Sequence, residues 1–177
     1  MNDLDALNVG LFVLRAAIGA VILAHGLNHL DKVRKGPGVA NWFESLGVKP
    51  GPFNAWMVTI TEIVTGVMLI VGFLTPLAAA GVIGVVVVAF VTNHRDAGFF
   101  VFNRPVEGWE YLMVLAAACV TLGATGAGEW SLDYSFDILD DLQGTTGLWL
   151  TVLVGFGGAA AFLGAFYRPP KKDDAAS

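Results

Sequence analysis

The stretch from Leu7 to Leu30 reads LNVGLFVLRAAIGAVILAHGLNHL and is apolar over most of its length. A transmembrane helix needs about 20 predominantly apolar residues, so this stretch is long enough to cross a bilayer. It nevertheless contains Arg15 and His25. A charged side chain at the bilayer centre costs roughly 2.5 to 3.5 kcal/mol, and such residues therefore tend to face the interior of a helix bundle. The stretch predicts a membrane bundle with polar groups inside it.

Four further stretches share this apolar character. The chain of 177 residues is 55% hydrophobic and 14% charged, with a mean hydropathy of +0.67, which excludes an ordinary soluble domain. We therefore predict an all-α membrane protein with short connections, so that any soluble catalytic module must come from a partner. The five predicted transmembrane helices are Leu7–Leu30, Asn54–Leu74, Leu77–Asn93, Gly108–Thr125 and Thr146–Tyr167.

The basic residues predict the orientation of the chain. All Lys and Arg residues except Arg15 fall in the first loop, the third loop or the C-terminal tail. Because cytoplasmic loops carry an excess of Lys and Arg, we expect a multi-pass protein of the cell (inner) membrane, with its N-terminus outside and its C-terminus in the cytoplasm. These residues are Lys32, Arg34, Lys35, Lys49, Arg95, Arg104, Arg168, Lys171 and Lys172.

Charge and cysteine content narrow the chemistry. The formal net charge of −5 argues against a nucleic-acid partner. Cys119 is the only cysteine, so the chain can form neither an intramolecular disulfide nor a C-x-x-C redox pair. We predict no metal site and assign no catalytic residue.

Small and polar residues follow Arg15 along one face of the first predicted span. This stripe consists of Arg15, Gly19, Ile22, Gly26 and His29, with His25 beside it. A matching stripe in the second span consists of Thr59, Glu62, Thr65 and Gly66. Because small residues let helices approach closely, we expect Arg15 and Glu62 to meet inside the bundle. Such a pair could fix helix register alone, or it could line a pocket for a quinone headgroup, a small substrate or a relayed proton.

Three more ionisable residues, His25, His94 and Glu110, fall toward the cytoplasmic half. We expect His25 to be hydrogen-bonded near the membrane interface. A haem held by His25 and His94 is an alternative that we do not favour, because no second histidine pair accompanies them. Glu110 begins the fourth span, where the helix dipole stabilises a carboxylate. With Arg15 and Glu62, these residues form the predicted polar pocket.

The same residues carry a resemblance to a known family. In order along the chain, the matching pieces are Leu14-Arg15, His25-Gly26, Trp42–Gly47, Glu62, Gly72–Thr75, His94, Gly98–Phe100, Trp109–Tyr111 and Gly126–Asp133. Over about Leu7 to Asp133, the chain resembles DoxX family membrane proteins. The resemblance implies a compact four-helix transmembrane bundle in residues 1–133. Residues 134–177 would add an outer loop, a fifth transmembrane helix and a cytoplasmic tail.

The resemblance also implies a function. Members of the family have been linked to membrane oxidoreductase assemblies, including a subunit of thiosulfate:quinone oxidoreductase. We therefore expect an accessory, non-catalytic subunit of a membrane-bound oxidoreductase or respiratory-chain assembly. Its expected partners are the lipid bilayer and the other proteins of that assembly, and quinone is the possible cofactor. Two alternatives stay open: a quinone-linked oxidoreductase acting by itself, in which Glu62 or His25 relays protons, and a small proton-linked transporter.

Overall fold

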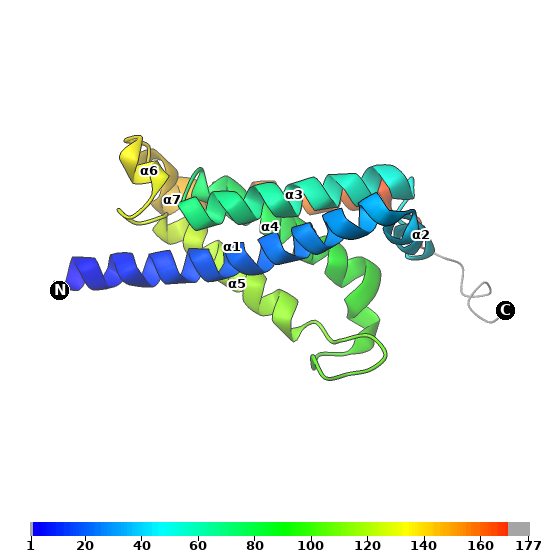
Figure 1. Ribbon diagram of the computed structural model, residues 1–177. Coiled ribbons are helices and arrows are strands. Elements are labelled where there is room, and N and C mark those ends of the chain that lie inside the picture. The colour runs from blue at the N-terminus through cyan, green and yellow to red at the C-terminus, as the bar shows by residue number, and fades with distance from the viewer. Residues whose placement is uncertain (1, 170–177) are drawn as a thin grey trace.

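The computed structural model describes residues 2–169, which form a bundle of helices joined by short loops (Figure 1). The long helices are α1 (Asp3–Lys35), α3 (Gly51–Val71), α4 (Thr75–Ala89), α5 (Glu110–Thr125) and α7 (Gly144–Phe166). The short elements are α2 (Gly38–Ser45), the π-helical turn η1 (Phe90–His94), the 3-10 turns η2 (Arg95–Ala97) and η3 (Asp140–Leu142), and α6 (Leu132–Ser135). Residues 2–169 contain no β-strand, and the all-α prediction is confirmed.

Four helices are long and apolar enough to cross a membrane: α1, α3, α4 with its continuation to Ala97, and α7. The fourth predicted span corresponds to α5, which has only 16 residues. At 1.5 Å per residue α5 is about 24 Å long, shorter than a hydrocarbon core of about 30 Å. The length criterion is therefore met at four of the five predicted spans, and a crossing by α5 stays a prediction.

Helix α1 is longer than the apolar stretch that predicts it. Its N-terminus has a capping box, in which the side chain of Asn2 accepts a hydrogen bond from the backbone N–H of Asp5 and the Asp5 carboxylate accepts one from Asn2. The 33 residues span about 50 Å, and the first turns of α1 extend beyond the other helices (Figure 1). Arg15 therefore lies nearer to one end of the bundle than the apolar stretch suggests.

The close approach of α1 and α3 confirms the prediction from the small-residue stripes. A Cβ atom added at Gly19 would lie 2.7 Å from the backbone oxygen of Gly66, and one added at Gly26 would lie 2.8 Å from the backbone nitrogen of Ile63. Only glycine fits at such contacts. The two helices run antiparallel, so residues late in α1 face residues early in α3.

Helix α4 is central: it packs against α3 on one side and against α5 and α7 on the other. Helices α3 and α4 are joined by a tight turn at residues 72–74, and Thr75 and Pro76 are the first residues of α4. On the far side, the buried Thr151 hydroxyl of α7 donates a hydrogen bond of 3.0 Å to the carbonyl of Pro76. The helix added after the four-helix bundle is thus packed into the core around α4.

The described basic residues other than Arg15 gather at one end of the bundle, which we call the basic end. It is the end that carries α2 and the loop after η2, whereas α6 and the N-terminus lie at the opposite end (Figure 1). Its basic residues are Lys32, Arg34, Lys35, Lys49, Arg95, Arg104 and Arg168. The predicted cytoplasmic tail from residue 170 onward lies outside the described residues.

Candidate functional site

Arg15 is fully buried but does not meet Glu62, so the predicted Arg15–Glu62 contact is wrong. Its guanidinium instead donates hydrogen bonds to four backbone carbonyls, at the end of the bundle opposite the basic end. These belong to Leu69 at 3.0 Å, Ile70 at 2.7 Å, Ala127 at 3.1 Å, and Trp130. The antiparallel register explains the difference, because it places Arg15 beside the last turn of α3, about 10 Å along the helix from Glu62.

The surroundings of Arg15 assign it a structural role. The last carbonyls of a helix carry partial negative charge, and Arg15 from α1 satisfies two of them at the end of α3. Asp133 does the converse for α4, accepting hydrogen bonds from the backbone N–H groups of Leu74 at 2.6 Å and Thr75 at 3.0 Å. Arg15 and Asp133 together hold the turn between α3 and α4.

Gly72 completes this turn. Its φ of +66° is in the left-handed region, and an added Cβ atom would lie 2.8 Å from the guanidinium carbon of Arg15. Glycine therefore allows both the helix end and the close approach of the arginine. Of the two alternatives for Arg15, the helix-fixing role fits this geometry and the pocket-lining role does not.

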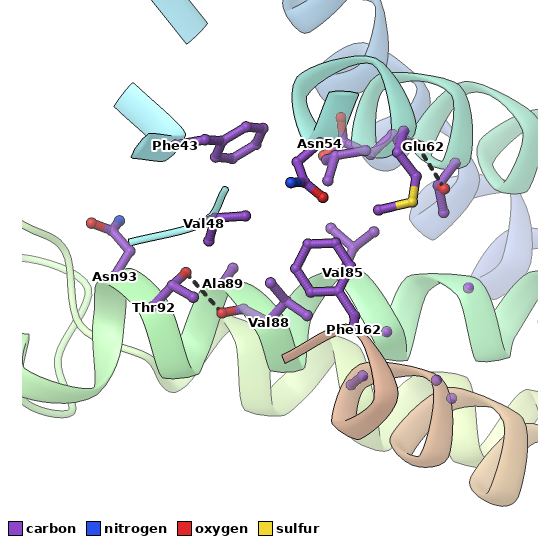
Figure 2. Close-up of a pocket in the computed structure, with 18 of the residues that line it drawn as sticks. Phe43, Val48, Asn54, Glu62, Val85, Val88, Ala89, Thr92, Asn93 and Phe162 are labelled. Atoms are coloured by element: carbon purple, nitrogen blue, oxygen red, sulfur yellow. Dashed lines mark hydrogen bonds between the residues drawn. The ribbon is translucent and has the colours of Figure 1, made fainter. Parts of the chain in front are cut away.

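A cavity of about 390 Å³ lies between α3, α4 and α7 (Figure 2). Its volume is in the range of small-molecule sites, roughly 300 to 1,000 Å³. The wall is mainly apolar: Val85 and Val88 line it from α4, and Phe162 lines it from α7. It reaches the surface beside α7, where the cavity-lining residues Val154 and Gly158 are exposed. A lipophilic molecule could therefore enter from the side of the bundle.

At its basic end the cavity is lined by Phe43 of α2 and by Val48 in the loop that follows (Figure 2). This loop is tied to the end of α7. Val48 forms an antiparallel bridge with Tyr167, and the backbone N–H of Lys49 donates a hydrogen bond of 3.0 Å to the carbonyl of Phe166. The contact holds α7 against the α2–α3 segment at this end of the cavity.

The central polar feature of the cavity is a pair formed by His29 and Glu62. Nδ1 of His29 lies 2.8 Å from Oε2 of Glu62, and the glutamate is 4% exposed. His29 comes from the last third of α1 and Glu62 from the middle of α3, which the glycine contacts bring together. A half-buried imidazole and a buried carboxylate in one hydrogen bond form an acid–base pair that can take up or release a proton.

His94 also lines the cavity, at the end of the π-helical turn η1. Its Nδ1 atom lies 2.7 Å from the carbonyl of Glu107, and its Nε2 atom lies 3.2 Å from Nδ2 of Asn93. Since a carbonyl can only accept and Nδ2 of Asn93 can only donate, the proton of a neutral His94 is on Nδ1. Both ring nitrogens are therefore engaged in hydrogen bonds.

The other two predicted pocket residues lie elsewhere. His25 is exposed on the surface of α1 and is not among the residues that line the cavity with His94. Glu110 accepts a hydrogen bond of 2.9 Å from the backbone N–H of Val101 and so holds the loop that precedes α5. The structure thus brings Glu62 and His94 to one cavity, and it separates them from Arg15, His25 and Glu110.

Sequence reasoning missed two cavity residues, His29 and Asn54. His29 lies on the same small-residue stripe as Gly26, whereas His25 lies beside that stripe. Helical position alone therefore favours His29 over His25 as the histidine that faces α3. Asn54 gives no comparable signal, because a single asparagine at the start of a span is common at membrane interfaces. No group of three or more metal-ligating side chains occurs within residues 2–169.

The fold and the cavity define the class of protein. Apolar helices of spanning length surround the His29–Glu62 pair, an arrangement typical of integral membrane proteins, in which ionisable groups face the interior of the bundle. Residues 10–95 match the family model of DoxX, and the protein is a DoxX family membrane protein. The match ends at Arg95, so the later pieces of the resemblance, from Gly98 to Asp133, lie outside it. No curated protein and no solved structure matches the chain.

Proposed function

We propose that this DoxX family protein is an accessory subunit of a membrane-bound oxidoreductase and that its cavity holds the quinone of that assembly. The observation that carries the proposal is the combination of a mainly apolar cavity of about 390 Å³ with the His29–Glu62 pair on its wall, whose carboxylate is buried. An isoprenoid quinone has an apolar tail and a polar head that exchanges protons when its redox state changes. The apolar wall suits the tail, and an acid–base pair suits the head.

The opening of the cavity supports a ligand that arrives through the membrane. Val154 of α7 is 48% exposed at the rim, and Gly158 is exposed one turn further along the same helix. Both are apolar positions on a helix of spanning length. A quinone dissolved in lipid would meet this rim without passing through water.

The distribution of charge supports an orientation in the inner membrane. If the basic end faces the cytoplasm, the N-terminus and α6 lie outside. The His29–Glu62 pair and His94 then lie toward the cytoplasmic half of the bundle. Protons released or taken up at this pair would exchange with that side.

Extraction of bound quinone tests the cavity assignment. A Cβ atom added at Gly158 meets no atom within 4 Å, so Gly158→Phe can be accommodated while its ring fills the mouth of the cavity. Gly157→Phe is the matched control, since Gly157 is also exposed, also has open space, and does not line the cavity. Each variant is purified in native lipid particles, and the quinone per protein is measured by solvent extraction and mass spectrometry.

The wild type and Gly157→Phe should retain quinone above the level of the surrounding lipid, and Gly158→Phe should not. Equal quinone in all three samples, at the ratio of bulk lipid, would refute quinone binding in the cavity. The assembly is tested separately by gentle extraction, cross-linking and identification of co-purifying proteins. A redox enzyme should co-purify, and a homogeneous particle that contains this chain alone would contradict the accessory role.

A further inference from the structure

One buried polar atom on the cavity wall has its hydrogen-bonding capacity unused. Asn54 of α3 is fully buried, and its Nδ2 atom donates a hydrogen bond of 2.8 Å to the carbonyl of Pro50. Because a carbonyl can only accept, this bond fixes which end of the amide is nitrogen. Oδ1 of Asn54 must point the other way, and within residues 2–169 it has no hydrogen-bond partner.

The amide of Asn54 projects into the cavity (Figure 2). In that view it lies between Phe43 and Val48 on one side and Val85 and Phe162 on the other. None of these side chains can donate a hydrogen bond. Buried polar atoms are nearly always paired, so an unpaired acceptor that faces a cavity indicates a donor on the molecule that occupies it.

The donors on the cavity wall are largely committed to the protein itself. The hydroxyl of Thr61 donates to the carbonyl of Met57 at 2.8 Å, and the hydroxyl of Thr92 donates to the carbonyl of Val88 at 2.9 Å. The Nδ1 proton of His94 is directed at a backbone carbonyl. The indole N–H of Trp42, which also lines the cavity, belongs to an exposed side chain. Around Asn54, therefore, the wall offers an unused acceptor and no donor.

We infer that Asn54 determines which redox form of the ligand the cavity prefers: its Oδ1 atom accepts a hydrogen bond from the hydroxyl of a quinol. This inference rests on the proposed quinone site. A quinone carbonyl carries no proton, and beside Oδ1 it would bring two acceptors together. A quinol donates from both hydroxyl groups. The cavity therefore binds the reduced form more tightly than the oxidised form.

Binding of the two redox forms tests the inference. Decylubiquinone and decylubiquinol are titrated calorimetrically, without oxygen, into the full chain in lipid nanodiscs. The wild type should bind decylubiquinol about tenfold more tightly, the factor expected from one hydrogen bond made by one form only. Asn54→Leu should lower the affinity for decylubiquinol about tenfold and leave that for decylubiquinone unchanged. Asn28→Leu, at an exposed asparagine of α1 outside the cavity, is the matched control.

A second variant distinguishes loss of the acceptor from loss of the structural hydrogen bond. Asn54→Leu also removes the hydrogen bond to Pro50, whereas Asn54→Asp loses that bond but keeps an acceptor in the cavity. Asn54→Asp should therefore keep the preference for decylubiquinol. Folding of each variant is checked by protection of Cys119, which is buried, against a thiol reagent.

The outcomes separate the two proposals. If neither form binds to the wild type, the quinone site itself is overturned. If both forms bind the wild type equally, or the oxidised form binds more tightly, the quinone site stands and the role of Asn54 is overturned. An unchanged preference in folded Asn54→Leu also overturns that role, because the preference of the wild type would then not come from a hydrogen bond to Oδ1.

Discussion

Replacing Arg15 with methionine should destabilise the bundle strongly without changing its apolar surface. Methionine is close to arginine in volume and fits an apolar interior, so the change removes the guanidinium with little change in volume. Three of the four carbonyls that Arg15 bonds, those of Ile70, Ala127 and Trp130, would lose their donor, whereas the Leu69 carbonyl would keep the backbone N–H of Gly72. The buried carboxylate of Asp133 would lose the positive charge that lies across the same turn.

The expected loss can be worked from these contacts. A buried acceptor left unpaired costs about 1 to 3 kcal/mol. The three carbonyls that lose their donor set an upper limit, which relaxation and water will reduce, above all at Trp130, where the residue is 52% exposed. Removal of one member of a buried charge arrangement typically costs about 3 to 5 kcal/mol. We expect a loss of about 4 kcal/mol in the free energy of unfolding. For a chain of this size, that corresponds to a fall in Tm on the order of 10 °C.

The only cysteine of the chain provides the assay. Cys119 is fully buried, so a fluorogenic maleimide reacts with it only when the bundle opens. The Tm of Arg15→Met is compared with that of Arg168→Met, which alters an exposed arginine whose hydrogen bonds are to the carbonyls of Gly164 and Tyr167. Arg168→Met should shift the unfolding free energy by less than about 0.5 kcal/mol. If Arg15→Met melts within about 2 °C of the wild type, the structural role of Arg15 is refuted.

Three further predictions follow from the packing, the helix ends and the charge distribution. Gly26→Leu should lower the free energy of unfolding by about 1 to 3 kcal/mol in the same assay, because the new side chain would collide with α3. Gly10→Leu is the control, since Gly10 has open space around it and the change should have little effect. Equal effects would contradict the close α1–α3 contact. Asp133→Asn should lower stability by about 1 to 2 kcal/mol through loss of the charge at the N-terminus of α4, and an unchanged Tm would argue against this capping role. The orientation is tested in intact cells with a maleimide that cannot cross the membrane, and the native Cys119 does not interfere because it is buried. The reagent should label Asp140→Cys, at the end opposite the basic end, and should not label Lys35→Cys. The reverse pattern would show that the orientation is inverted.

The helices and their inward faces were predictable because the signals are local. Runs of apolar residues of bilayer length predict spans, and the period of small residues predicts which side of α1 faces another helix. Gly19 and Gly26 in the structure lie against α3 as that period indicates. The predicted bounds of the fourth span agree with α5 to within two residues, because the residues before Glu110 form a loop held by that carboxylate, but the helix is too short for its crossing of the membrane to be established.

The candidate site was only partly predictable because it depends on how far one helix is displaced along another. Glu62 and His94 do line the cavity, but the histidine that pairs with Glu62 is His29. His25 is one turn away from His29 and faces outward. Asn54 carries no sequence signal, since its role arises from a hydrogen bond to Pro50 and from side chains of α2, α4 and α7 around it.

The amino-acid sequence by itself determined that this chain is a helical membrane protein and that Arg15 and Glu62 lie inside it, because charges in apolar helices must avoid lipid. Only the tertiary structure decided their partners. Hydrophobic periodicity reports the direction in which a side chain points, but the axial register comes from distant contacts, here the glycines between α1 and α3 and the loop that reaches back from Ala127 to Asp133. In that register Arg15 donates hydrogen bonds to the carbonyls at the end of α3, and Glu62 is paired with His29 beside the cavity.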